Sequence, residues 1–231
     1  MTKTGAWRRG VAEAVLILAS ILIAFWIDAS WEDRQAADLE FEALSAVRVE
    51  VEDNIQRLEQ TKSVNERYLE DVDRFLRATP DELRSLPLDA VRSWIGSLMR
   101  PAGFDADRAA ASVLATLPMS PSGESAEARR LVSRLQSQLR RTERVEQGVV
   151  NVYATVREQL THYASRSAPM GREDVPSMVA QVGPDVLAQL RMDNEFVSAV
   201  IEKSHVQFIY LRTLDQVTQI LDSLAVLLNE R

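Results

Sequence analysis

The chain has only two histidines, and each has a carboxylate one helical turn before it. Glu158 precedes His162 by four residues, and Glu202 precedes His205 by three. The second pair matches the Glu-x-x-His element that di-iron helical bundles place on two of their helices. Such a site needs a second Glu-x-x-His element and glutamates from two further helices, so these pairs are starting points for a metal centre and not a complete one.

The sequence predicts no metal, no cofactor and no enzymatic activity. Acidic residues make up 34 of the 231 residues, so a histidine gains an acid one turn away by chance roughly half the time. A full ligand set is not visible, and no nucleophile motif or phosphate loop occurs. Four weak metal-ligand candidates remain: Glu158, His162, Glu202 and His205.

Composition narrows the class of protein further. Cysteine is absent, so disulfides, thiolate metal sites and a cysteine nucleophile are excluded. The formal net charge is −7, which argues against a general nucleic-acid binder. Six arginines between 129 and 144 form the densest basic cluster, but Glu127, Glu143 and Glu146 are mixed with them. The cluster could bind anionic lipid or another partner, but the mixture is more typical of a solvated helix face that neutralises itself.

The opening of the chain carries a long apolar run. Every residue from Ala14 to Ile27 is apolar except Ser20. Trp7 and Trp31 lie 24 residues apart, or ~36 Å along a helix, which exceeds the ~30 Å hydrocarbon core of a bilayer. Together with Trp26, these side chains stand where interfacial tryptophans would anchor a membrane helix.

The flanks of this run predict an orientation in a membrane. The charges before and after it are opposite: Lys3, Arg8 and Arg9 precede it, and Asp28, Glu32 and Asp33 follow it. The positive-inside rule then predicts a cytoplasmic N-terminus over 1–10, an uncleaved signal-anchor over 11–31 and an extracytoplasmic domain over 32–231.

Two pairs of residues within or before the run suggest contacts of the anchor. Glu13 lies four residues after Arg9, so the pair can bridge at headgroup level; a functional intramembrane carboxylate is the alternative. Ser20 and Ala24 form a small-xxx-small element, which lets two membrane helices approach closely.

Three long helical patterns fill the rest of the chain. They span about 28–76, 125–165 and the stretch from Asp193 or Asn194 to the C-terminus, with apolar residues recurring at three and four residues. The last apolar seam includes Ile201 and Phe208, with His205 between them. Shorter helices are predicted after Thr79-Pro80 and over 88–99, 105–117 and 184–190, with loops at 118–124 and around Pro169, Gly171 and Pro176.

These patterns predict an all-α fold. We expect an N-terminal transmembrane helix followed by an elongated antiparallel helical bundle, with three long helices and two to four short ones. No breaker separates the anchor from the first long pattern, so whether the two form one helix stays open.

The opening residues resemble a known group. Glu13, the run Ile21–Phe25 and the segment Asp28–Arg34 are similar to the start of uncharacterised bacterial single-pass membrane proteins, which have an E-x-x-x-V-x-x-G-x-x-I-A-type anchor followed by D-A-W-W-E-E-R. Phe104–Arg108, ahead of a short helix, is also similar; Ser20 and Ser30 depart from the group's glycine and tryptophan. The resemblance implies a helical protein in the bacterial cytoplasmic membrane, without catalytic residues.

Two functions are compatible with these features. The first is an accessory or scaffolding subunit that binds a membrane complex or itself. The second is an extracytoplasmic ligand-sensing bundle that acts through a partner. The expected partners are the lipid bilayer and another membrane protein or a second copy, and not nucleic acid. An exposed apolar stripe would favour the scaffold, and a polar-lined pocket between helices would favour the sensor.

Overall fold

The computed structural model describes residues 3–99, 103–117, 123–167 and 182–229, and side chains within 16–98, 103–117, 125–163 and 182–229. In these residues the chain forms seven helices and no strand. The all-α prediction is therefore confirmed.

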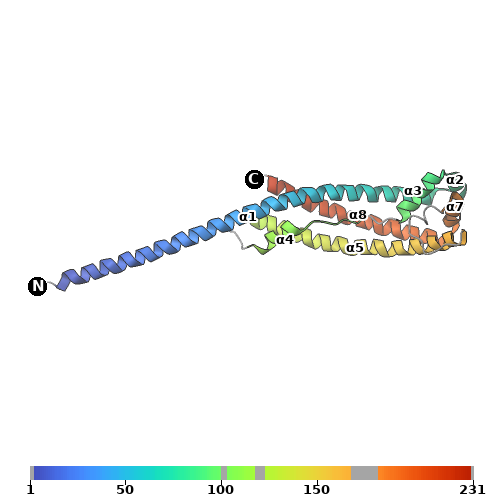
Figure 1. Cartoon of the computed structure of the whole chain (residues 1–231). Helices are drawn as coiled ribbons and strands as arrows, with labels where there is room; N and C mark the ends of the chain where they lie inside the picture. Colours follow the sequence, from blue (N-terminus) through green and yellow to red (C-terminus); the bar gives the residue numbers. More distant parts are fainter. Residues whose placement is uncertain (1–2, 100–102, 118–122, 168–181, 230–231) are drawn as a thin grey trace.

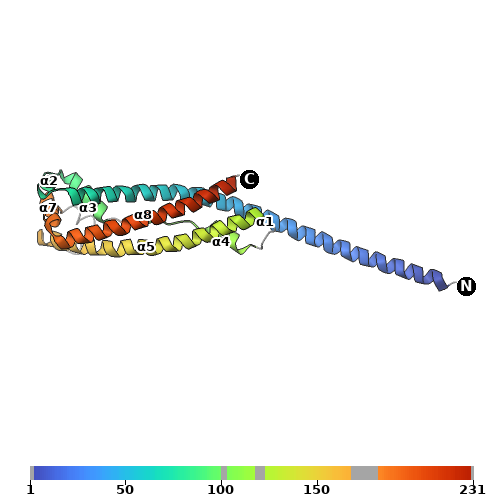
Figure 2. The same ribbon diagram turned by 180° about the vertical axis from the view of Figure 1, so that it is seen from behind.

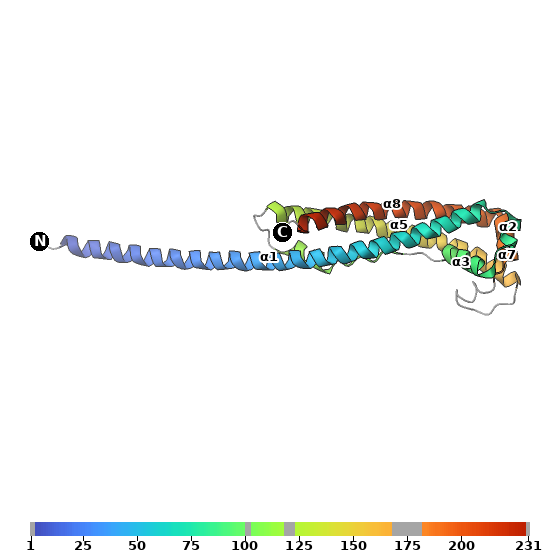
Figure 3. The ribbon, with the colours of Figure 1, turned by 90° about the horizontal axis from the view of Figure 1, so that it is seen from above.

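Three long helices run side by side: α1 (Lys3–Arg77), α5 (Gly123–Ser167) and α8 (Asn194–Asn229) (Figures 1 and 3). Helix α8 runs antiparallel to the other two. Helix α1 is unbroken over 75 residues, or roughly 110 Å, which answers the open question: the opening run and the first long pattern form one helix.

Four short helices complete the fold: α2 (Pro80–Arg84), α3 (Leu88–Met99), α4 (Ala109–Thr116) and α7 (Pro184–Met192). Helices α2, α3 and α7 lie at the end of the bundle that is far from the N-terminus, and α4 lies towards the other end (Figure 2). The predicted Thr79 cap is confirmed, since Thr79 and Glu82 form a capping box. The Asp193 cap of α8 is confirmed as well, because Asp193 Oδ1 accepts from the N–H groups of Glu195 and Phe196.

One sequence prediction of local structure needs correction, and the loop predictions lie wholly or partly outside the described residues. The helix predicted to begin at Asp105 begins at Ala109, because side chains of α1 bind the backbone of the preceding stretch. The loop predicted around Pro169, Gly171 and Pro176, and residues 118–122 of the other loop, lie outside the described residues.

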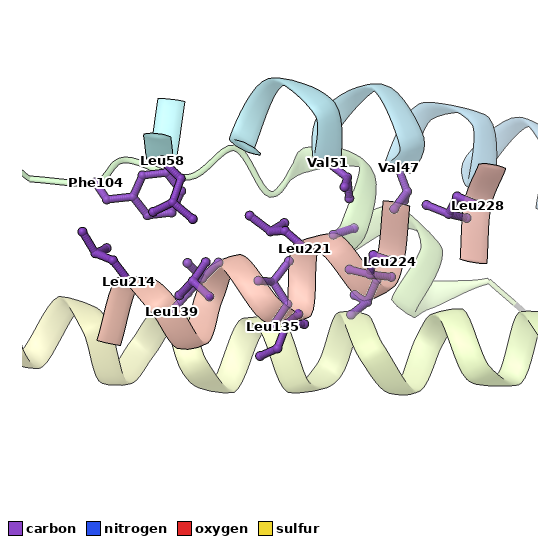
Figure 4. Packing of buried hydrophobic residues seen from close by; sticks show 14 of the residues in the cluster. Val47, Val51, Leu58, Phe104, Leu135, Leu139, Leu214, Leu221, Leu224 and Leu228 are labelled. Carbon is purple, nitrogen blue, oxygen red and sulfur yellow. The ribbon is translucent and has the colours of Figure 1, made fainter. Parts of the chain in front are cut away.

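The core forms where the three long helices face one another. Figure 4 shows leucines and valines of α1, α5 and α8 meeting between the ribbons, with Phe104 and Leu58 at one end. A second cluster fills the end capped by the short helices, where the rings of Phe75 and Phe196 meet edge to face at 5.9 Å. Burial of this apolar area, at ~25 cal/mol per Å², is the main stabilising contribution.

The N-terminal part of α1 projects from the bundle as a single helix (Figure 1). Glu40 is the first buried residue of α1 in the part with described side chains. Residues 16–39 are all exposed except Ser30, which is partly buried.

The predicted single-pass membrane protein is wrong. Within the described residues, no helix is both long and apolar enough to cross a bilayer. The continuous apolar run from Ala14 to Ile27 has 14 residues, or ~21 Å, against the ~30 Å required, and Asp28 follows at once. The transmembrane assignment of 11–31 and the location in a bacterial cytoplasmic membrane are corrected with it, as are the cytoplasmic N-terminus and the extracytoplasmic domain over 32–231.

Candidate functional site

The projecting part of α1 exposes a dense group of large apolar side chains, which we call the apolar segment (Leu16–Trp31). Leu16, Trp26 and Trp31 are each about 70% exposed. The full set is Leu16, Ile17, Leu18, Ile21, Leu22, Ile23, Phe25, Trp26, Ile27 and Trp31. Monomeric proteins rarely leave a contiguous apolar surface of this size in water.

These side chains point to every side of the helix. Residues 16–18, 21–23 and 25–27 are each three consecutive apolar residues, and consecutive residues are ~100° apart around an α-helix. A helix that is apolar all round is normally buried within a larger structure. The bundle of this chain does not supply that cover, because it begins beyond residue 39.

The structure describes some of the residues predicted to form the membrane anchor. Ser20 and Ala24 lie one turn apart on the exposed helix, and Ser20 Oγ donates to the Leu16 carbonyl at 2.8 Å. The small-xxx-small contact between two helices stays a prediction. Four anchor residues lie on α1 with side chains outside the described residues: Trp7, Arg8, Arg9 and Glu13.

The metal-ligand candidates are not brought together. Glu158 and His162 lie exposed on α5, and Glu202 and His205 lie exposed on α8. Among the described residues, no group of three or more His, Asp and Glu side chains is placed to hold a metal ion. His162 instead meets the Tyr163 ring edge to face.

His205 lines a surface groove between α1 and α8. Its volume is about 400 Å³, and its lining residues are Leu69, Asp73, Leu76, Ile201, Ser204, His205 and Phe208. The prediction that Ile201 and Phe208 belong to the core is wrong, because they are 53% and 49% exposed.

Between Ile201 and Phe208, the buried positions of α8 are taken by the polar residues Lys203 and Gln207. Lys203 is fully buried, and its Nζ donates to the Ser97 carbonyl at 3.0 Å. Ser97 Oγ in turn donates to Asp71 Oδ2 at 2.6 Å. Burial lowers the pKa of Lys203 to about 8 because the apolar surroundings disfavour its charge. One turn further on, buried Gln207 donates to Asn65.

Two carboxylates hold α4 and the stretch before it against the bundle. Glu50 of α1 accepts hydrogen bonds from the N–H groups of Ala110 and Ala111, at 2.6 and 3.3 Å, and so caps α4. Burial raises the pKa of Glu50. The two N–H groups act in the opposite direction, because they favour the charged carboxylate.

Glu146 of α5 holds the same stretch from the other side. It accepts from the Phe104 N–H, and the Tyr210 hydroxyl donates to its Oε2 at 3.4 Å. Burial raises the pKa of Glu146 and also that of Tyr210. Gly103 has no Cβ here, and a Cβ at that position would overlap the Glu146 carboxylate.

The arginines of α5 are partly matched with acids, as the sequence suggests. Arg130 pairs with Glu127 at 2.6 Å and Arg129 with Glu40 of α1 at 3.7 Å, whereas Glu143 pairs with Arg108, which lies outside α5. Glu146 departs from this expectation, because it faces inward to the backbone near Gly103 and not to the arginines.

Sequence reasoning missed the roles that Glu50, Asn54, Glu146 and Lys203 take in the structure. Their partners are backbone groups more than 40 residues away along the chain, so no local spacing reveals them. One signal in the sequence could have indicated these roles: a charged or amide residue on the apolar face of a helix. Lys203 is such a residue, because it lies three residues after Val200 and eleven before Leu214, on the same face as both.

The chain was compared with protein-family models, with curated proteins and with solved structures, and none matches. The resemblance to uncharacterised bacterial membrane proteins stays a prediction. The geometry of the apolar segment is therefore the strongest lead to function.

Proposed function

We propose that this chain is a non-enzymatic assembly protein, in which the bundle supports the apolar segment and presents it to a protein partner. The single observation that carries this proposal is the exposure of ten large apolar side chains on a helix that continues directly into the bundle. An uncovered apolar helix is unfavourable in water, so a partner that covers it gains free energy for every Å² buried.

The bundle is suited to be a rigid support. Helix α1 runs without a break from the apolar segment into the core, where Leu44, Val47 and Val51 are buried. A force or displacement at the segment would reach the bundle through a continuous helix. The chain would thus fix the position of its partner as well as bind it.

The ligand-sensing alternative has less support. A sensor needs a pocket with converging polar groups. The α1–α8 groove and a groove between α5 and α8, which includes Leu131 and Val226, are both open to the surface and mainly apolar. The buried Lys203 amine donates to the Ser97 carbonyl, so it is already engaged within the chain and does not point into a pocket as a ligand contact.

Affinity capture of the tagged full chain at its native level tests the proposal. The proteins that copurify would be identified and their molar ratios measured. We expect at least one protein, a further copy of the chain included, at a fixed ratio. Recovery of a single monomeric chain would contradict the proposal.

Two matched variants make the capture specific. The segment variant, Leu18→Gln, Leu22→Gln and Phe25→Gln, removes three exposed apolar side chains from the segment. The control variant, Val49→Gln, Val113→Gln and Met192→Gln, removes three exposed ones from the bundle. The segment variant should lose the partner at least tenfold and keep the thermal stability of the bundle, whereas the control should retain the partner.

A further inference from the structure

We propose that the apolar segment is covered by the same segment of a second copy, packed antiparallel to it. This inference rests on the proposed function and names the partner. It follows from three properties of the projecting helix: the charge of its flanks, its length beyond the bundle and its exposed area.

The flanks of the segment carry opposite charge. In the sequence, Lys3, Arg8 and Arg9 precede it and outnumber Glu13. At its other end, Asp28, Glu32 and Asp33 are exposed and outnumber Arg34. Two parallel copies would place like charges together, whereas two antiparallel copies place the basic flank of each beside the acidic flank of the other. The helix is therefore self-complementary about a two-fold axis, which is the symmetry of most homodimers.

The length of the projection allows this arrangement. A pair centred between Ile21 and Leu22 places residues 4–39 of each copy beside residues 39–4 of the other, an overlap of ~54 Å of helix. No residue from 16 to 39 is buried in the single chain, so this part of α1 can receive the partner helix. The two bundles begin at opposite ends of the overlap and do not collide.

The exposed area is large enough for a stable contact. Phe25, Trp26 and Trp31 are each about 70% exposed, and three aromatic side chains at ~150–250 Å² each then offer ~300–500 Å² per copy. The aliphatic side chains add to this area, and each copy that packs on another face of the segment buries a further part of it towards the ~1,000 Å² that marks a specific interface. Because the segment is apolar on all sides, two such pairs can also join into a four-helix core.

Pairing about a point between Ile21 and Leu22 defines which residues meet. Leu18, Leu22 and Phe25 lie on one face at spacings of four and three residues. In the antiparallel pair, Leu18 of one copy faces Phe25 of the other. The two Leu18 residues are then seven residues apart along the axis, or ~10 Å, beyond the ~4.4–6.8 Å between Cα atoms that a disulfide spans.

Cysteine pairing tests the inference cleanly, because the natural chain has no cysteine. Full chains carrying Leu18→Cys or Phe25→Cys would be oxidised alone and as an equimolar mixture. We expect cross-linked dimers in the mixture at a yield at least tenfold above that of Leu18→Cys alone. Equal cross-linking of Leu18→Cys alone would indicate parallel packing and overturn the inference, and so would the absence of cross-linking in the mixture.

The mass of the full chain in detergent-free buffer gives an independent measurement. Light scattering should show an even multiple of 25.9 kDa for the natural chain and the control variant, and 25.9 kDa for the segment variant. A monomeric natural chain, or heterogeneous aggregates of no defined mass, would overturn the inference. A monomer that floats with phosphatidylcholine vesicles would also overturn it, because lipid would then cover the segment.

Failure of this inference can be told apart from failure of the proposed function. If the purified chain is monomeric but the capture experiment recovers a different protein through the segment, the assembly function stands and only the second copy is excluded. If the chain is monomeric and the segment variant captures the same proteins as the natural chain, both are wrong.

Discussion

Asn54 and Asp107 are 53 residues apart in the chain and hold each other by two hydrogen bonds. The Asn54 amide donates to the Asp107 carbonyl at 2.8 Å, and the Asp107 N–H donates to Asn54 Oδ1 at 2.9 Å. The amide thus satisfies both backbone groups of one residue and fixes the stretch before α4 against α1. Without it, both backbone groups of Asp107 would lose their partner within the chain.

Substitution of this amide should destabilise the fold. Asn54→Ala leaves a backbone donor and acceptor without their partner, so we expect the free energy of unfolding to fall by about 1–3 kcal/mol. Asn151→Ala, which changes an exposed amide on α5, is the control and should change it by less than ~0.5 kcal/mol. Urea denaturation measures both, and equal small effects would show that the Asn54 bonds contribute little.

Two glycines should respond in opposite directions to the same substitution. Gly103→Ala places a methyl group on the Glu146 carboxylate; this flexible side chain can move aside but loses its hydrogen bonds to Phe104 and Tyr210, so stability should fall by about 0.5–1.5 kcal/mol. Gly96→Ala lies in α3 with nothing within 4 Å of the new Cβ, and should raise stability by about 0.5–1 kcal/mol. Thermal unfolding of both variants checks the signs.

The carboxylates of Glu50 and Glu146 should make stability depend on pH. Burial raises the pKa of each above the ordinary value of 4.5, so in the range just above 4.5 the folded state binds more protons than the unfolded state. Their contribution to the free energy of unfolding therefore decreases as pH rises through the folded pKa values. Compared with the variant Glu50→Gln and Glu146→Gln, the natural chain should lose more stability between pH 5 and 7. Parallel pH profiles of the two proteins would contradict this.

Lys203 should produce the opposite slope at alkaline pH. Its pKa is lowered from 10.5 to about 8 in the folded chain, so the unfolded state binds more protons between these values. Stability should rise as pH increases from about 8 to 10.5, by roughly 3 kcal/mol in total. Lys203→Met lacks this rise, and the difference between the two chains in urea denaturation at pH 7.5 and 10 measures it. If the stability of both chains changes equally with pH, the Lys203 amine is not buried and the prediction is wrong.

Helix positions were predictable because their signals are local. The capping residues Thr79 and Asp193 and the apolar period of α5 are contained within a few residues each, and the structure places these helices close to the expected bounds. The start of α4 was not predictable in the same way. It depends on Glu50 and Asn54, which lie more than 50 residues before it.

The orientation of α8 shows a second limit of sequence patterns. An apolar period alone places Ile201 and Phe208 inside, yet Lys203 and Gln207 occupy the core because Ser97 and Asn65 supply hydrogen bonds there. The apolar segment was identified from the sequence, but the prediction that it crosses a membrane was wrong. An apolar run indicates that a helix must be covered, and leaves open by what.

Hydrogen exchange along α1 in the captured complex most directly tests whether the apolar segment is the binding surface. We expect the backbone amides of residues 16–31 to exchange at least tenfold more slowly in the complex than in the segment variant, because a covered helix opens less often than a bare one. The amides of α8 should be equally protected in both. If residues 16–31 exchange as fast in the complex as in the variant, the partner binds elsewhere and the proposed function is wrong.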